Sequence, residues 1–359
     1  MLNIFDEAQW RRVEDTYEAW WQRKIDRPVL HLTFGGADPG MRPPYGLVTG
    51  DLFRYSPGEP AELIAEKIEY IMRSMRYEYD AFPYIYMYFG PIYEVEFFGA
   101  RAYIDDSTVW FRTENAPPIR EMHVTAIDKN SLFYPSYRKI AKACEERFGS
   151  GYAITPPLAG GCCLDYVAEF YKPTDLSYML YDEPDEVNRL SMEFHKASFA
   201  VGRELTALTP SARGYTYEGM FAPVPWKLMQ CDYSAMIGPE HFERFVKWDI
   251  ELSVSESPRH NFYHLDGPGA VIHLDTILSI PDLKCVQWVP GIGEKPAAAW
   301  PEVYKKISGA GKNIWLFNEL EDVEKIADQI GTAKGLYWKG CYPLSEYDRV
   351  MKIAERLMA

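Results

Sequence analysis

The chain has 359 residues, a net charge of −14 and a sequence pI near 5.1. At about 150 residues per domain, this length fits two ordinary domains or one large (β/α) barrel. Nucleic acids and anionic membranes both attract basic surfaces, so the acidic balance argues against either as the main partner. The hydrophobic fraction of 47% is typical of a folded globular protein, whereas the aromatic fraction of 15% is high.

Several classes of protein are excluded by missing patterns. No apolar run approaches the 18 or so residues that a membrane helix needs, and the charged N-terminus does not resemble a signal peptide. The chain lacks the common nucleotide-binding, zinc-protease and esterase motifs. Its six cysteines are scattered without a C-x-x-C pair, which is typical of a cytoplasmic protein with reduced thiols. These cysteines are Cys144, Cys162, Cys163, Cys231, Cys285 and Cys341.

The first segments alternate between helix and strand patterns. Apolar residues at helical spacing, among them Trp10, Tyr17 and Trp21, predict a helix over about the first 25 residues, ended by Pro28. Residues 29–34 alternate and end at two glycines, which predicts a strand. A second long helix is predicted over residues 60–77.

The rest of the chain repeats a strand–loop–helix unit. In the C-terminal half, short apolar runs recur every 22–28 residues and each is followed by a helical pattern. The predicted strands are residues 29–34, 84–88, 152–155, 214–217, 262–265, 285–289, 313–317 and 335–338. Strands that alternate with helices pair in parallel through right-handed crossovers.

Eight such strands predict a (β/α)8 TIM barrel of the α/β class. An open doubly wound sheet is the alternative, but the glycine-rich first turn typical of that fold is missing. We expect a single domain over residues 1–359. Residues 1–27 would form an N-terminal helical extension, and the aromatic-rich segment after residue 77 would form part of an insertion.

Candidate site residues follow from the barrel, because catalytic groups lie where its strands end. Glu218 follows the fourth strand, Asp266 the fifth and Asn318 the seventh, while Gln287 and Trp288 lie within the sixth. Together with Tyr86, Tyr88 and Tyr217, the residues Gln287, Trp288 and Asn318 are predicted to bind substrate.

His264-x-Asp266 is the most specific local pattern. Side chains two apart on a strand point the same way, so an imidazole and a carboxylate could bind one metal or form an acid–base pair. With Cys341 and Glu218 they could complete a zinc site. The alternatives are a helix-capping Asp266 and a small buried Cys341. Asp232 precedes a helix start and either contacts substrate or caps that helix.

The aromatic residues are concentrated in one segment, with 13 of them between residues 77 and 111. This segment runs through the second predicted strand and its following loop. A tyrosine-rich wall there would suit a flat ligand. The alternative is additional core between the insertion and the barrel.

Several motifs resemble the uroporphyrinogen decarboxylase superfamily. They are Tyr263-His264-Leu265-Asp266-Gly267-Pro268-Gly269, Gln287-Trp288-Val289-Pro290-Gly291, Cys231-Asp232-Tyr233-Ser234, Gly238-Pro239-Glu240-His241-Phe242 and Gly340-Cys341. The resemblance covers roughly residues 160–358 and implies a (β/α)8 barrel, with a homodimer plausible for such proteins.

Two branches of that superfamily predict different chemistry. The decarboxylases carry N-terminal arginines that bind the porphyrinogen carboxylates, but residues 31–36 contain none. The cobalamin-dependent methyltransferases hold zinc with a His-x-Cys motif and a later Cys. His264 and Cys341 match two of these positions, while Asp266 stands where the first Cys would be.

Three hypotheses follow from the sequence. In the first, the protein moves a methyl group between a small O- or N-methylated substrate and a corrinoid carrier, with zinc at His264, Asp266, Cys341 and Glu218 and a corrinoid protein as partner. In the second, it is a metal-free decarboxylase of a tetrapyrrole or smaller aromatic acid, with Asp232 or Asp266 stabilising the intermediate. In the third, it binds a corrinoid or tetrapyrrole without catalysis.

Overall fold

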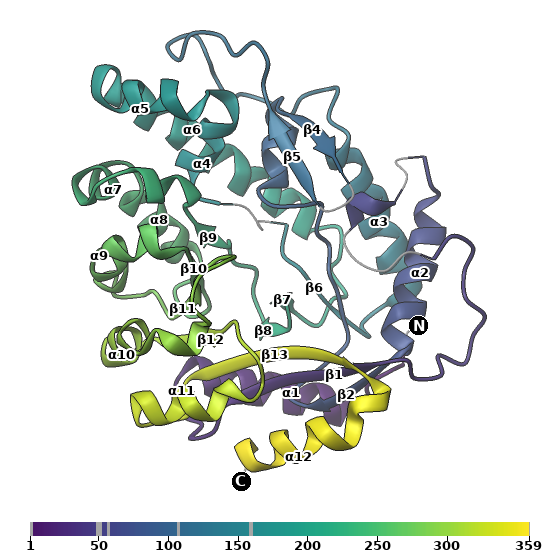
Figure 1. Ribbon diagram of the computed structural model, residues 1–359. Helices are drawn as coiled ribbons and strands as arrows, with labels where there is room; N and C mark the ends of the chain where they lie inside the picture. The colour runs from purple at the N-terminus through teal and green to yellow at the C-terminus, as the bar shows by residue number, and fades with distance from the viewer. Residues whose placement is uncertain (1–2, 48–51, 56–57, 106–107, 158–160, 359) are drawn as a thin grey trace.

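A computed structural model describes residues 3–47, 52–55, 58–105, 108–157 and 161–358. The largest sheet has seven strands in the order β2-β1-β13-β12-β11-β10-β9, all parallel except β2, which is antiparallel to β1 (Figure 1). The strands are β1 (Val29–Gly35), β2 (Met75–Tyr79), β9 (Met229–Gln230), β10 (Phe262–Asp266), β11 (Cys285–Val289), β12 (Asn313–Leu316) and β13 (Leu336–Pro343).

A second sheet has four strands in the order β3-β6-β7-β8, and β4 and β5 form a separate hairpin. These strands are β3 (Tyr84–Ile85), β6 (Ala153–Ile154), β7 (Tyr215–Tyr217), β8 (Met220–Ala222), β4 (Arg101–Ile104) and β5 (Val109–Arg112). β3, β6 and β7 are parallel, whereas β8 returns antiparallel beside β7.

Helices α7–α12 lie on the outer side of the seven-stranded sheet, while α2 and α3 lie at the opposite side of the molecule (Figure 1). The helices are α1 (Glu7–Trp21), α2 (Ala61–Arg73), α3 (Phe133–Phe148), α4 (Cys163–Phe170), α5 (Pro173–Asp182), α6 (Pro184–Thr206), α7 (Pro239–Phe245), α8 (Lys247–Glu256), α9 (Leu274–Leu278), α10 (Pro301–Gly309), α11 (Asp322–Ile330) and α12 (Tyr347–Met358), with short 3-10 turns that include η2 (Tyr93–Phe98) and η3 (Asp232–Met236). Within the described ranges, no helix is both long and apolar enough to cross a bilayer.

All eight predicted strands are present, but their hydrogen bonds do not close one ring among the described residues. The reason lies in two strands that the sequence analysis missed. β2 pairs with the edge of β1 that would face β3, and β8 pairs with the edge of β7 that would face β9. The fold is therefore a mixed α/β arrangement of two sheets, and the predicted closed barrel is not confirmed.

The missed strand β2 also shortens a predicted helix. The sequence predicts helix over residues 60–77, but α2 ends at Arg73 with Ser74 as its C-cap. Residues 75–79 instead form β2, where Tyr77 pairs with Thr33. A helical pattern cannot show that an unpaired edge of β1 is available, so tertiary pairing decides this boundary.

Helix α1 confirms the predicted N-terminal helix and packs against the amino ends of β12 and β13. Asp6 and Gln9 form a capping box at its start. The indole of Trp20 donates to the carbonyl of Leu336 at 3.0 Å, and the amide of Asn313 donates to the carbonyl of Trp20 at 3.1 Å. Because α1 lies at the amino ends, the carboxyl ends of these strands are left for a site.

Candidate functional site

Glu218 lies in a tight turn between β7 and β8. Tyr217 pairs with Met220, so Glu218 and Gly219 form a two-residue hairpin turn, and both have positive φ, 45° and 85°. This conformation strongly favours Asn-Gly or Gly-Gly, and a glutamate there is strained by about 1 kcal/mol or more. Such strain persists only where the surroundings hold it, and it is concentrated at functional sites.

Two tyrosine hydroxyls hold this turn in place. Tyr337 donates to the carbonyl of Glu218, and Tyr17 of α1 donates to the carbonyl of Gly219, both at 2.7 Å. A side chain at Gly219 would not fit, since a Cβ would lie 2.5 Å from the ring of His31. The turn is therefore fixed from three elements, and the carboxylate of Glu218 is aimed by that framework.

That carboxylate forms an ion pair with Lys339 of β13. Lys339 Nζ lies 3.1 Å from Glu218 Oε2, and the hydroxyl of Tyr86 donates to Oε1 at 3.5 Å. Burial alone would lower the pKa of Lys339, but the nearby Tyr84 and Glu218 outweigh it and raise that pKa above its usual range. Lys339 is thus a protonated ammonium at neutral pH, only 30% exposed.

A cavity of about 250 Å³ opens beside this ion pair, at the carboxyl ends of β1 and β13. Its walls are mostly apolar and come from α2, β2 and the residues around β3, while its polar side comes from β1 and β13. The lining residues are His31, Thr33, Leu52, Tyr55, Ile68, Ile71, Met72, Met75, Tyr77, Tyr84, Tyr86, Lys339 and Cys341. We call this the Lys339 cavity.

His31 lines the inner end of the Lys339 cavity. It is 1% exposed, and its ring contacts Phe82 and Tyr84 edge-on at 5.0 and 5.6 Å. Its Nδ1 atom has no hydrogen-bond partner in the part of the chain that the structure describes. Burial, aided by the positive charge of Lys339, lowers the pKa of His31 to about 3, so the imidazole is neutral.

A second polar group gathers at the ends of β9 and β10. Asp232 feels the charges of both His264 and Asp266, and burial raises its pKa. Asp165 of α4 is buried and accepts backbone N–H bonds from Asp232 and Tyr233 at 3.0 and 2.9 Å. Asp165 therefore caps η3, and Asp232 is held beside the His264-x-Asp266 pair that the sequence singled out.

Asp232 faces a groove of about 720 Å³ between the β4–β5 hairpin and α4. Tyr103 and Phe111 of the aromatic-rich segment form part of its wall. Glu169 also lines it, and burial together with the charge of Asp232 raises the pKa of Glu169 to about 7. The groove thus combines aromatic faces with clustered carboxyl groups.

The four predicted zinc ligands do not come together as one set. Among the described residues, the single group of three or more His, Cys, Asp or Glu residues with ligand atoms within 4.8 Å of one another is Cys163, His195 and Asp249. Glu218 is engaged by the Lys339 ammonium, and His264 Nδ1 contacts Gln287 Oε1 at 2.5 Å. Cys341 lines the Lys339 cavity. The predicted set therefore does not fit a zinc ion as arranged.

The group Cys163, His195 and Asp249 could hold a metal by its ligand types, but a lysine ammonium already lies within it. Lys227 Nζ is 3.8 Å from Asp249 Oδ1 and 3.7 Å from Cys163 Sγ. Burial alone would raise the pKa of Asp249, but Lys227 and His195 outweigh it and hold it at about 2. Burial raises the pKa of the Cys163 thiol, which disfavours the thiolate that a metal needs.

The predicted substrate-binding residues divide between the cavity and the core. Tyr86 lines the Lys339 cavity and stacks on Tyr88, with ring centroids 5.0 Å apart. Tyr217 is buried against Phe262 and Trp315, beneath the turn. Trp288 is fully buried and packs on Trp300, with ring centroids 5.2 Å apart.

Two further predicted residues have mainly structural contacts. Gln287 is buried and holds the ring of His264, as described above. Asn318 lies in the loop after β12, where its backbone carbonyl accepts a hydrogen bond from the indole N–H of Trp338 at 2.9 Å. The buried rings of the aromatic-rich segment, such as Phe82, Phe89 and Tyr93, show that this segment is both a cavity wall and additional core.

From the sequence, Lys339 follows the last predicted strand and His31 lies in the first, facing either the barrel mouth or the core, but neither was assigned a role, and Tyr84 was not nominated at all. A signal for Lys339 existed, since it lies two residues before Cys341 and on the same face of its strand. Nothing in the sequence pairs Lys339 with Glu218, 121 positions away.

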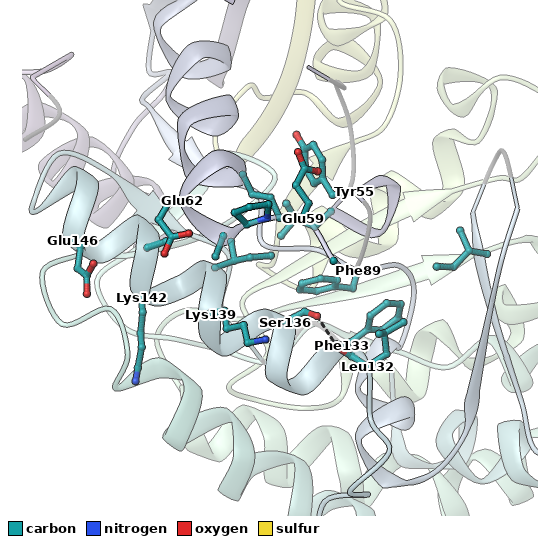
Figure 2. Close-up of a pocket in the computed structure, with 18 residues that line it drawn as sticks. Tyr55, Glu59, Glu62, Phe89, Leu132, Phe133, Ser136, Lys139, Lys142 and Glu146 are labelled. Atoms are coloured by element: carbon teal, nitrogen blue, oxygen red, sulfur yellow. Dashed lines mark hydrogen bonds between the residues drawn. The ribbon is translucent and has the colours of Figure 1, made fainter. Parts of the chain in front are cut away.

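Another hollow of about 530 Å³ lies between α2 and α3. Phe89 and Phe133 lie at one end, while Lys142, Glu62 and Glu146 lie at the other (Figure 2). None of the predicted site residues lines it, and its charged groups lie on exposed helical faces. The strand-end cavities therefore remain the candidate site.

The strain at Glu218 gives a stability prediction. Glu218→Asn and Glu218→Gln both remove the charge opposite Lys339, but asparagine tolerates positive φ whereas glutamine does not. We expect the Asn variant to be more stable than the Gln variant by about 1 kcal/mol in chemical denaturation. Equal stability of the two would show that the turn is not strained.

A buried carboxyl group, Glu94 of η2, gives a pH prediction. Both of its oxygens lack a partner elsewhere in the described ranges, and burial raises its pKa from 4.5 to about 7. The unfolded chain therefore ionises first, and Glu94 costs stability as the pH rises from about 4.5 to 7. Relative to wild type, Glu94→Gln should gain up to about 3 kcal/mol of unfolding free energy between pH 4 and pH 8. A pH-independent difference would contradict this.

The chain was compared with known proteins. No protein-family model matches it, and no curated protein matches its sequence. Among solved structures, a methyltransferase from Methanosarcina mazei has a similar fold, with a TM-score of 0.59 over 97% of this chain and 99% of that chain. Only 12% of the residues are identical, so this likeness shows the fold alone. This likeness does not establish that the chain belongs to the uroporphyrinogen decarboxylase superfamily.

Proposed function

We propose that this protein is a methyltransferase that takes a methyl group from a small O- or N-methylated substrate bound in the Lys339 cavity. The observation that carries the proposal is the strained, tyrosine-held Glu218 turn that aims a carboxylate at Lys339 beside that cavity. The likeness to the Methanosarcina mazei methyltransferase supports it at the level of fold. In this proposal the two sheets are the parts of an open barrel, with the site at their carboxyl ends.

Methyl transfer leaves negative charge or an electron pair on the atom that loses the methyl group. Lys339 provides a fixed ammonium where that charge develops, and Glu218 is a positioning residue that holds the ammonium in place. The apolar walls exclude water, which strengthens this electrostatic contribution. The residues of the cavity thus supply leaving-group stabilisation without a metal step.

The methyl acceptor in this proposal is a corrinoid, treated as a co-substrate that supplies the electron pair for the new bond. Because the acceptor must contact the methyl group that it receives, it would approach over the open mouth of the Lys339 cavity. Since the predicted zinc ligands are not gathered, no step is assigned to zinc.

The proposal is tested by incubating the purified protein with free cob(I)alamin and a panel of small O- and N-methylated compounds. Protein-dependent loss of the cob(I)alamin absorption band, with release of the demethylated product, is the expected result. Protein that gives no demethylated product from any donor, at concentrations where cob(I)alamin is intact, would overturn the proposal. Release of carbon dioxide from aromatic acids would favour the decarboxylase alternative instead.

A further inference from the structure

The Lys339 cavity has the size and lining of a site for one substituted ring. A cavity of about 150 Å³ is enough for benzene, and this one is about 250 Å³. Ile68, Ile71 and Met72 supply its apolar side, and methionine sulfur packs well against aromatic rings. A single ring with one or two small substituents fits this space, whereas a tetrapyrrole does not.

The opposite side of the cavity carries polar groups that can bind one oxygen atom of a ligand. The ammonium of Lys339 lies there, close to Tyr84, which interacts with it electrostatically. The neutral imidazole of the buried His31 also lines this cavity, while Gly219 packs against its Nδ1 edge. The apolar side of the cavity suits the ring of a phenolate, and the cationic side suits its oxygen.

The chemistry of the leaving group favours the same ligand. An ammonium can stabilise a phenolate, whose conjugate acid has a reference pKa of about 10, as for tyrosine. An alkoxide is as basic as hydroxide, with a reference value of about 16, and usually needs a metal ion to leave. Without a gathered zinc set, the phenolate is the leaving group that these residues can support.

We propose that the methyl donor is an aryl methyl ether whose ring fills the Lys339 cavity and whose ether oxygen lies against the Lys339 ammonium. This inference rests on the proposed function. In the reaction the bond between methyl carbon and oxygen breaks, and its electron pair stays on the oxygen as a phenolate paired with Lys339. The Co(I) corrinoid supplies both electrons of the new bond to the methyl group, and the phenolate takes its proton from water after release.

Binding of 4-nitrophenol tests the site without any turnover. Its ionised form has its own visible absorption band, so a pH titration with protein in excess reports the pKa of the bound phenol. We expect Lys339 to lower that pKa by about one unit or more relative to free 4-nitrophenol. Lys339→Met should remove the shift, and the exposed Lys352→Met on α12 is the matched control that should keep it.

A second variant makes the test independent of any loss of folding in Lys339→Met. Glu218→Gln removes a negative charge next to the ligand oxygen and should tighten phenolate binding by about tenfold. An unchanged or raised pKa of the bound phenol in wild type, or weaker phenolate binding by Glu218→Gln, would overturn the inference.

The assay with methyl donors separates this inference from the proposed function. Methyl transfer from N-methylated donors, with no transfer from 4-nitroanisole and no binding of 4-nitrophenol, would overturn the inference and leave the function standing. Binding of 4-nitrophenolate through Lys339, with no transfer from any donor, would keep the phenolate site and overturn the function.

Discussion

Lys339→Met is expected to slow methyl transfer by about 100- to 1000-fold, the usual loss when one preorganised donor to a developing anion is removed. The substitution keeps a similar length but leaves the leaving oxygen without a positive charge, and Glu218 without its partner. The measurement is kcat with a fixed donor and cob(I)alamin. Because Lys339 is 30% exposed, we expect its loss to leave the fold intact by circular dichroism.

Lys339→Arg is the matched variant for this prediction. Arginine keeps the charge, so a purely electrostatic role predicts that much of the rate survives. If Lys339 instead had to deliver a proton, arginine would be as inactive as methionine, since its guanidinium does not deprotonate in proteins. Full activity of Lys339→Met would place the chemistry elsewhere.

Asp249→Leu is expected to destabilise the protein by about 3–5 kcal/mol. Asp249 is 1% exposed and compensates the buried ammonium of Lys227, and it also accepts from the backbone N–H of Cys163 at 2.6 Å. Removing the carboxylate leaves a buried charge without its partner. Urea denaturation at pH 7 measures the loss.

The double variant Lys227→Met with Asp249→Leu provides the control. Replacing both charges by apolar side chains should recover part of the lost stability, because the unpaired charge disappears while the backbone N–H of Cys163 and the ring of His195 still lack their acceptor. A double variant as unstable as Asp249→Leu alone would show that packing, and not the charge, is responsible.

The contribution of the wild-type pair to stability also depends on pH. With the pKa of Asp249 held at about 2, its contribution is present above pH 3.8 and is lost as the pH falls through 2.

Eight of the strands could be predicted from the sequence, because each is a short apolar run near a Gly or Pro, whereas β2, β4, β5, β8 and β9 were not predicted. Residues 285–289 were predicted with the bounds that β11 has. The strands at the edges of the sheets could not be predicted, since β2 and β8 become strands only through pairing with β1 and β7. Their short patterns carry no periodic signal, and Met75–Tyr79 reads equally well as the end of a helix.

The candidate site shows the same division. Glu218 could be nominated because it follows a predicted strand, and Tyr86 because it lies in another predicted strand of the aromatic-rich segment. The structure brings Tyr86 to Glu218 and Glu218 to Lys339. The zinc set failed because strand-end position does not fix the distance between side chains on different strands. The positive φ of Glu218 in its hairpin turn directs the carboxylate toward Lys339, and no sequence pattern shows that direction.

Local patterns were enough to predict the acidic, aromatic-rich α/β character of this protein, its eight core strands and the strand ends where polar groups gather. These depend on local composition and on periodicity, which a sequence displays directly. Packing in the folded protein decides that β2 and β8 keep the ring of hydrogen bonds open among the described residues, and that an ammonium, Lys339, lies opposite Glu218. Lys339 and Glu218 are 121 positions apart, and the pairing of β2 and β8 depends on which strand edges are free, so both follow from packing and from no local pattern.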